Sequence, residues 1–90
     1  MSKLVLITGA GTGIGRSIAE TLSNQGYALI LCGRNLNRLE ETKTNLKNPS
    51  NHSTHSCDIR KAGDVQSVLK KYNVESLYGL VANAGVGGEN

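Results

Sequence analysis

Three runs of apolar residues in the chain show no alternation with polar ones, and a fourth run of strand length is more polar. The apolar runs are Leu4 to Ile7, Tyr27 to Cys32 and Leu77 to Ala82. Uninterrupted apolar character is typical of parallel strands covered on both faces, so we expect three buried strands. The run from His52 to Cys57 is mostly polar, which favours a strand at the sheet edge, where one side stays wet.

The segments between these runs carry apolar residues at helical spacing. This pattern predicts helices from Ile14 to about Asn24, from Leu36 to about Lys47 and from about Ala62 to Tyr72. Gly26 suits the left-handed end of the first helix, and Asn35 is a good N-cap for the second. The side chains expected to face the core are those of Ile14, Ile18, Ala19, Leu22, Leu36, Leu39, Leu46, Val65, Val68, Leu69 and Tyr72.

Strands therefore alternate with helices along the chain. This order is typical of an α/β fold with a doubly wound (Rossmann-type) parallel sheet and helices on both faces, and the expected strand order is 3-2-1-4. Ninety residues suffice for one domain at most, so we expect residues 1–90 to form a single domain. The glycine-rich segment from Val86 to Asn90 is expected to lack regular structure.

Charge and hydropathy argue against several classes of partner. The chain has 10 basic and 7 acidic side chains and a net charge of +3, spread without the basic clusters of nucleic-acid surfaces. A membrane-spanning helix needs about 20 apolar residues, and no segment approaches that length. The first apolar run is too short for a signal peptide. We therefore expect a cytoplasmic protein that binds neither nucleic acid nor membrane.

The cysteines and histidines do not form a recognisable site. Cys32 and Cys57 are too few for a disulfide-stapled small domain, which favours free thiols in a reducing compartment. His52 and His55 lie near Cys57, but four ligands at the spacing of a zinc site are missing. We therefore expect no metal centre.

The most informative segment lies between the first predicted strand and the first predicted helix. Gly9, Gly11, Gly13 and Gly15 follow Thr8 within seven residues. Glycine is costly in backbone entropy, so this density indicates unusual dihedral angles or the close approach of another group, such as a phosphate at a helix N-terminus. All four glycines occupy odd positions, which is incompatible with both G-x-G-x-x-G and the P-loop pattern. The alternative is a tight turn without a ligand.

The pattern Thr8-Gly9-x-x-x-Gly13-x-Gly15 resembles the TGxxxGxG motif of the short-chain dehydrogenase/reductase family. The sequences CGR, CD and NAG after the other predicted strands also match, so the resemblance covers all ninety residues, as the N-terminal half of that family. The family's usual Asn-Asn-Ala-Gly begins here with Ala82 instead of Asn. The resemblance implies that the sheet is incomplete relative to the family's full sheet.

The resemblance also implies a nicotinamide dinucleotide at the carboxyl ends of the strands, where such sheets bind ligands. The implied cofactor-binding residues are Gly9, Gly11, Thr12, Gly13, Ile14 and Gly15 around the pyrophosphate, Arg34 at a 2′-phosphate, Asp58 and Ile59 at the adenine, and Asn83, Ala84 and Gly85 at the ribose. Asp58 is an equally good candidate to cap the following helix. Asn83 has the alternative role of satisfying backbone groups between strands.

The end of the second predicted strand indicates which cofactor is bound. Enzymes that select NAD place an acidic residue there, where it accepts hydrogen bonds from the ribose 2′-OH. In this chain Gly33 takes that position and Arg34 follows. A guanidinium fork suits a 2′-phosphate, so we expect NADP(H) rather than NAD(H). The alternative is that Arg34 is only a solvated residue at the start of the next helix.

The resemblance implies an oxidoreductase that transfers a hydride between the cofactor and a small-molecule carbonyl or alcohol, and a homo-oligomer in the complete protein. The family's Ser and Tyr-x-x-x-Lys pair has no counterpart, because the residues four positions after Tyr27, Tyr72 and Tyr78 are Leu31, Ser76 and Ala82. We therefore expect no catalytic residue here, and binding without turnover. The alternatives are a non-catalytic NADP-binding sensor or interaction module and a methyltransferase-like nucleotide fold, which the glycine pair at the helix tip disfavours.

Overall fold

The computed structural model describes residues 3–11, 13–58, 60–72 and 77–82. The elements in chain order are β1 (Leu4–Thr8), α1 (Gly13–Asn24), β2 (Ala28–Gly33), α2 (Leu36–Thr44), a 3-10 helix (Pro49–Asn51), β3 (Ser53–Ser56), α3 (Ala62–Leu69) and β4 (Leu77–Ala82). The expectation for the segment at 86–90 concerns residues outside the described part.

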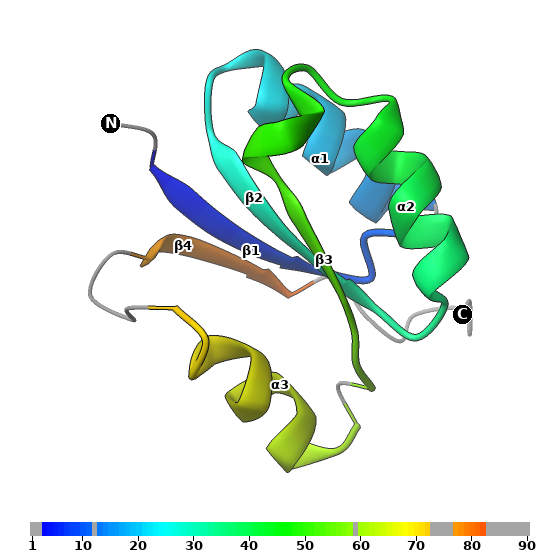
Figure 1. The fold of residues 1–90 in the computed structure, drawn as a ribbon, viewed down its shortest axis with the longest axis vertical. Helices are drawn as coiled ribbons and strands as arrows, with labels where there is room; N and C mark the ends of the chain where they lie inside the picture. Colours follow the sequence, from blue (N-terminus) through cyan, green and yellow to red (C-terminus); the bar gives the residue numbers. More distant parts are fainter. Residues whose placement is uncertain (1–2, 12, 59, 73–76, 83–90) are drawn as a thin grey trace.

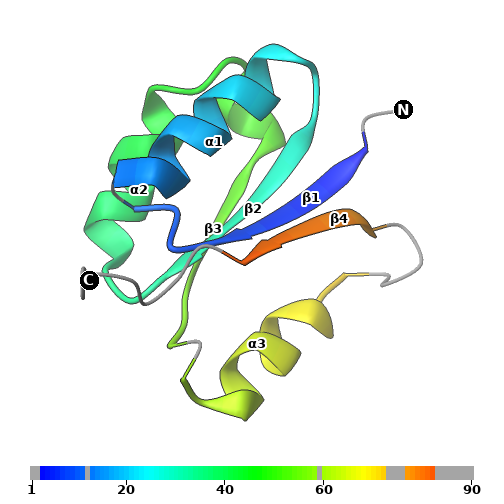
Figure 2. The same ribbon diagram turned by 180° about the vertical axis from the view of Figure 1, so that it is seen from behind.

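Four parallel strands form one sheet in the order β3-β2-β1-β4. The helices α1 and α2 cover one face of this sheet and α3 covers the other, as the two opposite views in Figure 1 and Figure 2 show. The predicted doubly wound fold and strand order are confirmed. Because β1 and β2 are central, their side chains are buried on both faces.

The core consists of two clusters, one on each face of the sheet. Successive residues of a strand point to opposite faces, so Ile7 belongs to one cluster and Leu6 to the other. The cluster under α1 and α2 includes Ala19, Leu39 and Leu46, which were predicted to face inward. The cluster under α3 includes Val68, with Val65, Leu69 and Tyr72 packed against it.

Two side chains predicted to face the core do not. Ile14 is 69% exposed and Leu36 is 45% exposed. Both lie in the first turn of their helices. Helical spacing identifies the inner side of a helix, but it does not tell how much of its first turn is covered.

The strand β4 is half-buried, contrary to the prediction of a strand covered on both faces. Its burial alternates between intermediate and exposed, and Tyr78 and Leu80 are each 58% exposed. Among the described strands β4 pairs only with β1, and the register shifts between Leu4 and Val5, opposite Tyr78. The Tyr78 ring lies 5.6 Å from the Tyr27 ring and 4.4 Å from the Lys3 amine.

Two helices end earlier than predicted, α2 at Thr44 rather than Lys47 and α3 at Leu69 rather than Tyr72. In both, the backbone beyond the helix switches to amide bonds with carbonyls three residues back, which tightens the last turn and ends the helix. The predicted stop at Gly26 (φ +96°) and the N-cap at Asn35 are confirmed. The edge position of β3 is confirmed too, over the shorter range Ser53–Ser56.

None of the described helices is long and apolar enough to cross a membrane.

Candidate functional site

The carboxyl ends of all four strands lie at one edge of the sheet. Thr8 pairs with Cys32 of β2 and with Ala82 of β4, and Gly33 pairs with Ser56 of β3. The loops that follow the strands therefore leave the sheet at the same edge, which is where doubly wound sheets bind ligands. Of the described residues predicted as cofactor-binding, Gly9, Gly11, Arg34 and Asp58 lie in these loops, and Gly13, Ile14 and Gly15 lie in the first turn of α1. Thr12, Ile59, Asn83, Ala84 and Gly85 fall outside the described residues.

The glycine-rich loop uses backbone angles that favour glycine at two positions. Gly9 has φ +66° and Gly13, the first residue of α1, has φ +57°. The loop is tied to the sheet by Ala10, whose amide donates to the Cys32 carbonyl at 3.1 Å. Because the first amides of a helix have no partner within it, the start of α1 presents donors and the positive end of the helix dipole to this edge.

Gly11 brings the loop against α2. A Cβ added at Gly11 would lie 3.1 Å from Cβ of Arg38, closer than real Cβ contacts normally come. The lack of a side chain therefore lets the loop pack directly on α2. Within α1, Gly15 is buried and Ile14 projects into solvent.

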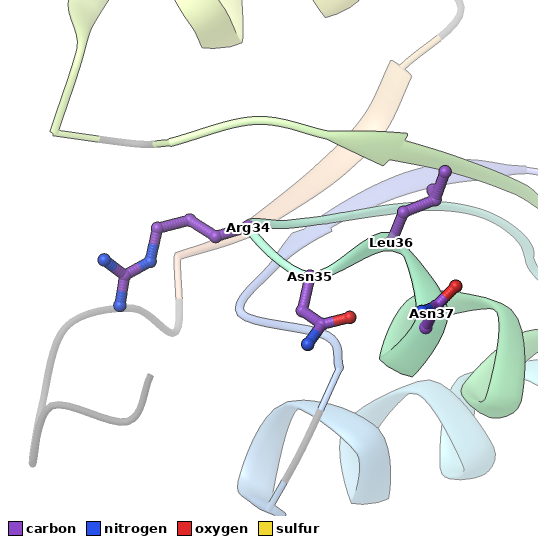
Figure 3. A pocket seen from close by; sticks show the side chains of 4 residues that line it. All are labelled: Arg34, Asn35, Leu36 and Asn37. Atoms are coloured by element: carbon purple, nitrogen blue, oxygen red, sulfur yellow. The ribbon is translucent and has the colours of Figure 1, made fainter.

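The turn after β2 places Arg34 at the same edge. Its side chain is exposed and extends away from the end of the strand (Figure 3). Asn35 accepts the Arg38 amide at 3.2 Å and so starts α2 directly after Arg34. A shallow depression of about 470 Å³ is lined by Arg34, Asn35, Leu36 and Asn37.

Asp58 forms a fork with Arg60, a residue that sequence reasoning did not select. The Arg60 Nε donates to Oδ1 of Asp58 at 3.0 Å and Nη2 donates to Oδ2 at 2.8 Å, while the Arg60 amide donates to Oδ1 at 3.0 Å. These bonds lower the pKa of the Asp58 carboxyl, with a smaller contribution from the charge of Arg34. The alternative that Asp58 caps α3 is wrong, because Lys61 is the N-cap.

The two cysteines and the two histidines are engaged within the protein. Cys32 and Cys57 are free, buried thiols in contact, and burial raises the pKa of both. His52 bonds to two backbone groups, and His55 bonds to the Tyr72 hydroxyl. Within the described part of the chain, no three side chains of His, Cys, Asp or Glu are grouped so that they could hold a metal ion.

Comparison with known proteins places this arrangement in a family. The sequence model described as short chain dehydrogenase matches residues 3–90. This chain belongs to the short-chain dehydrogenase family. The sulfoacetaldehyde reductase 2 of Chromohalobacter salexigens is 39% identical over 88 residues, which cover 96% of the chain and 35% of that protein. The farnesol dehydrogenase of Aedes aegypti is 34% identical over 90 residues, which cover 93% of the chain and 36% of that protein.

Solved structures show the same fold. A variant of actinorhodin polyketide ketoreductase with NADPH superposes with a TM-score of 0.82 at 29% identity, over 93% of this chain and 33% of that one. The 3-ketoacyl-(acyl-carrier-protein) reductase of Brucella melitensis, complexed with NADH, has a TM-score of 0.82 at 28% identity, over 94% of this chain and 35% of that one. The chain thus spans about a third of the length of these short-chain dehydrogenases, a family that binds nicotinamide cofactors.

Proposed function

We propose that this chain is the cofactor-binding part of an NADP(H)-dependent short-chain dehydrogenase, which transfers a hydride between the nicotinamide and a carbonyl or alcohol. The observation that carries the proposal is the position of Arg34. It follows β2 at the same sheet edge as the glycine-rich loop, and Gly33 stands where an NAD-selecting enzyme has its carboxylate.

The glycine-rich loop accounts for binding of the pyrophosphate. The positive φ of Gly9 and Gly13 turns the chain sharply from β1 into α1. A pyrophosphate above this turn would accept hydrogen bonds from loop amides and lie at the positive end of the α1 dipole. In this proposal Gly9, Gly11, Thr12, Gly13, Ile14 and Gly15 surround the pyrophosphate, and Asn83, Ala84 and Gly85 contact the ribose on the nicotinamide side.

The charges at the adenosine end account for the choice of NADP(H). Arg34 offers a planar, permanently charged fork, which matches a phosphate in a bidentate contact. Asp58 lies near enough for the Arg34 charge to lower its pKa, and its own charge is matched by Arg60. The three side chains together are cationic, which favours a 2′-phosphate. Asp58 and Ile59 would then contact the adenine.

The proposal assigns cofactor binding, but not catalysis, to these ninety residues. None of the three tyrosines is followed by a lysine four residues later, so the ninety residues are expected to bind NADPH without reducing a substrate. The proposal further includes a cytoplasmic location, a homo-oligomer in the complete protein and a single cofactor-binding domain formed by residues 1–90.

The proposal is tested by titrating NADPH and NADH into the wild-type chain and into Arg34→Ala. Because hydrogen bonds to charged groups contribute about 1.5–3 kcal/mol, Arg34→Ala should weaken NADPH binding by about 10- to 100-fold and leave NADH almost unchanged. Arg38→Ala is the matched control, since it removes the same charge one helical turn later. Equal NADPH affinity of wild type and Arg34→Ala would reject the role of Arg34, and equal losses in both variants would reduce it to a general charge effect.

A non-catalytic NADP-binding sensor or interaction module is the second candidate. It is favoured by the lack of a Tyr-x-x-x-Lys pair in the ninety residues. Both candidates require NADPH binding, and they differ in the gene: a downstream Ser and Tyr-x-x-x-Lys in the reading frame would support the enzyme, and a stop codon directly after Asn90 the module.

A further inference from the structure

The side chains of Arg16 and Thr42 connect the glycine-rich loop to both helices on that face of the sheet. Arg16, in the first turns of α1, donates from Nη2 to the Gly11 carbonyl at 2.8 Å and from Nε to Oγ1 of Thr42 at 2.8 Å. Thr42 is fully buried on α2, and its hydroxyl lies 3.0 Å from the Ala10 carbonyl. The carbonyls of two successive loop residues are therefore held by side chains 26 residues apart.

The Nη2 group of Arg16 also contacts two residues of α2. The same Nη2 lies 3.2 Å from the Arg38 carbonyl and 3.4 Å from Oε1 of Glu41. Arg16 thus joins the loop to the backbone and to a carboxylate of α2. In this geometry the guanidinium of Arg16 holds the loop against α2 and is not directed at a ligand.

The bond to Ala10 also determines where a loop amide points. The peptide unit is planar and trans, so the carbonyl of one residue and the amide of the next point in opposite directions. Because the Ala10 carbonyl points to Thr42, the Gly11 amide points away from α2. The Ala10 amide is bonded to the Cys32 carbonyl, so both ends of Ala10 are anchored and this orientation is preset.

We propose that Arg16 and Thr42 are positioning residues for the cofactor's pyrophosphate: they hold the loop carbonyls against α2 and thereby aim the loop amides at the bound phosphates. This inference rests on the proposed binding of NADP(H) at the loop. Neither side chain touches the cofactor. Arg16 and Thr42 orient the loop amides before the cofactor binds, so binding does not have to order the loop.

The test compares Thr42→Val, which keeps the shape of the side chain and removes the hydroxyl, with Thr42→Ser, which keeps the hydroxyl. Thr44→Val is the matched control, because the Thr44 hydroxyl lies on the same helix and donates to the carbonyl of Glu40, but reaches neither Ala10 nor Arg16. Each variant is titrated with NADPH and with adenosine 2′-monophosphate. The second ligand carries the adenine and the 2′-phosphate but no pyrophosphate.

The expected result is a loss of about tenfold or more in NADPH affinity for Thr42→Val, and less than about twofold for Thr42→Ser and Thr44→Val. Adenosine 2′-monophosphate should bind equally well to all of them. Unchanged NADPH binding by Thr42→Val would overturn this inference but not the proposed function. Equal losses for both ligands would overturn it too, because they would indicate a general structural effect. Failure of the wild-type chain to bind NADPH would overturn the proposed function as well.

Arg16→Gln provides a second, independent variant in case Thr42→Val does not fold. It removes the bonds to Gly11 and Thr42 from a side chain that is 30% exposed. The same selective loss is expected, at least about tenfold for NADPH and none for adenosine 2′-monophosphate. A loss of binding of both ligands in a folded Arg16→Gln protein would contradict the positioning role.

Discussion

The amide of Cys57 donates to the carbonyl of Gly33 at 2.7 Å, which continues the parallel pairing of β2 and β3 by one step beyond the last strand residues. The residues that follow Gly33 and Cys57 are Arg34 and Asp58. This bond therefore places a cation and an anion close together at the carboxyl ends of β2 and β3. The proposed discrimination between the cofactors depends on how the charge of Asp58 is balanced there.

Arg60 is predicted to balance that charge. In Arg60→Gln the carboxylate of Asp58 loses its fork, so the pKa of this carboxyl should rise toward its ordinary value, which carboxyl-carbon NMR during a pH titration measures. An uncompensated carboxylate beside Arg34 should also weaken NADPH binding several-fold more than NADH binding. Lys61→Gln removes the same charge from the next residue and should leave both quantities nearly unchanged. An unaltered Asp58 pKa in Arg60→Gln would contradict the role of the fork.

The pKa of His55 predicts a pH dependence of stability. The His55 Nε2 lies 2.6 Å from the Tyr72 hydroxyl, which also bonds to Ser53, and burial and then the charge of Lys71 lower the pKa of His55 from its ordinary 6.5. The unfolded chain therefore binds more protons between the two pKa values. The free energy of unfolding should be highest above about pH 6.5 and should fall as the pH drops through the lowered pKa of His55.

Imidazole proton NMR of the folded chain measures that pKa directly. Lys71→Gln should move it back toward 6.5, since one of its two causes is removed, while Lys70→Gln serves as a control of equal charge change. A His55 that titrates at or above 6.5 in the folded protein would be incompatible with this account.

His52 is predicted to be a structural residue. It is buried, its Nδ1 accepts the Leu29 amide at 3.1 Å, and its Nε2 lies 2.8 Å from the Lys47 carbonyl. His52→Leu fills similar space but leaves both backbone groups without a partner, which should lower the free energy of unfolding by about 2–4 kcal/mol. Urea denaturation measures this change. Asn51→Ala, at the exposed neighbouring position, should stay within about 0.5 kcal/mol of wild type, and an equally small effect of His52→Leu would disprove the bridging role.

Local patterns in the sequence were sufficient for the fold and for the position of the site. The apolar runs of β1 and β2, the glycines after Thr8 and the turn at Gly33 all act through neighbouring residues, so the strands, the loop and the sheet edge could be predicted. The exposure of Ile14 and Leu36 could not, because it depends on how much of the first turn of each helix is covered, which helical spacing does not tell.

The supporting contacts of the site were not predictable for a related reason. Arg16 and Thr42 are 26 residues apart on different helices, and only the packing of α2 against the loop brings them together. The fork of Arg60 on Asp58 spans only two residues, and an Asp-x-Arg spacing at the end of a predicted strand is a signal that could have revealed it.

The central claim is that the loop between β1 and α1 binds the pyrophosphate of NADP(H). An NADPH titration of the ¹⁵N-labelled chain, followed by amide NMR, tests it most directly. The account predicts saturable shifts at the amides of Gly9, Gly11, Gly13 and Gly15, with a smaller response to NADH at equal concentration. Shifts confined to other parts of the chain, or none at NADPH concentrations that saturate short-chain dehydrogenases, would contradict it.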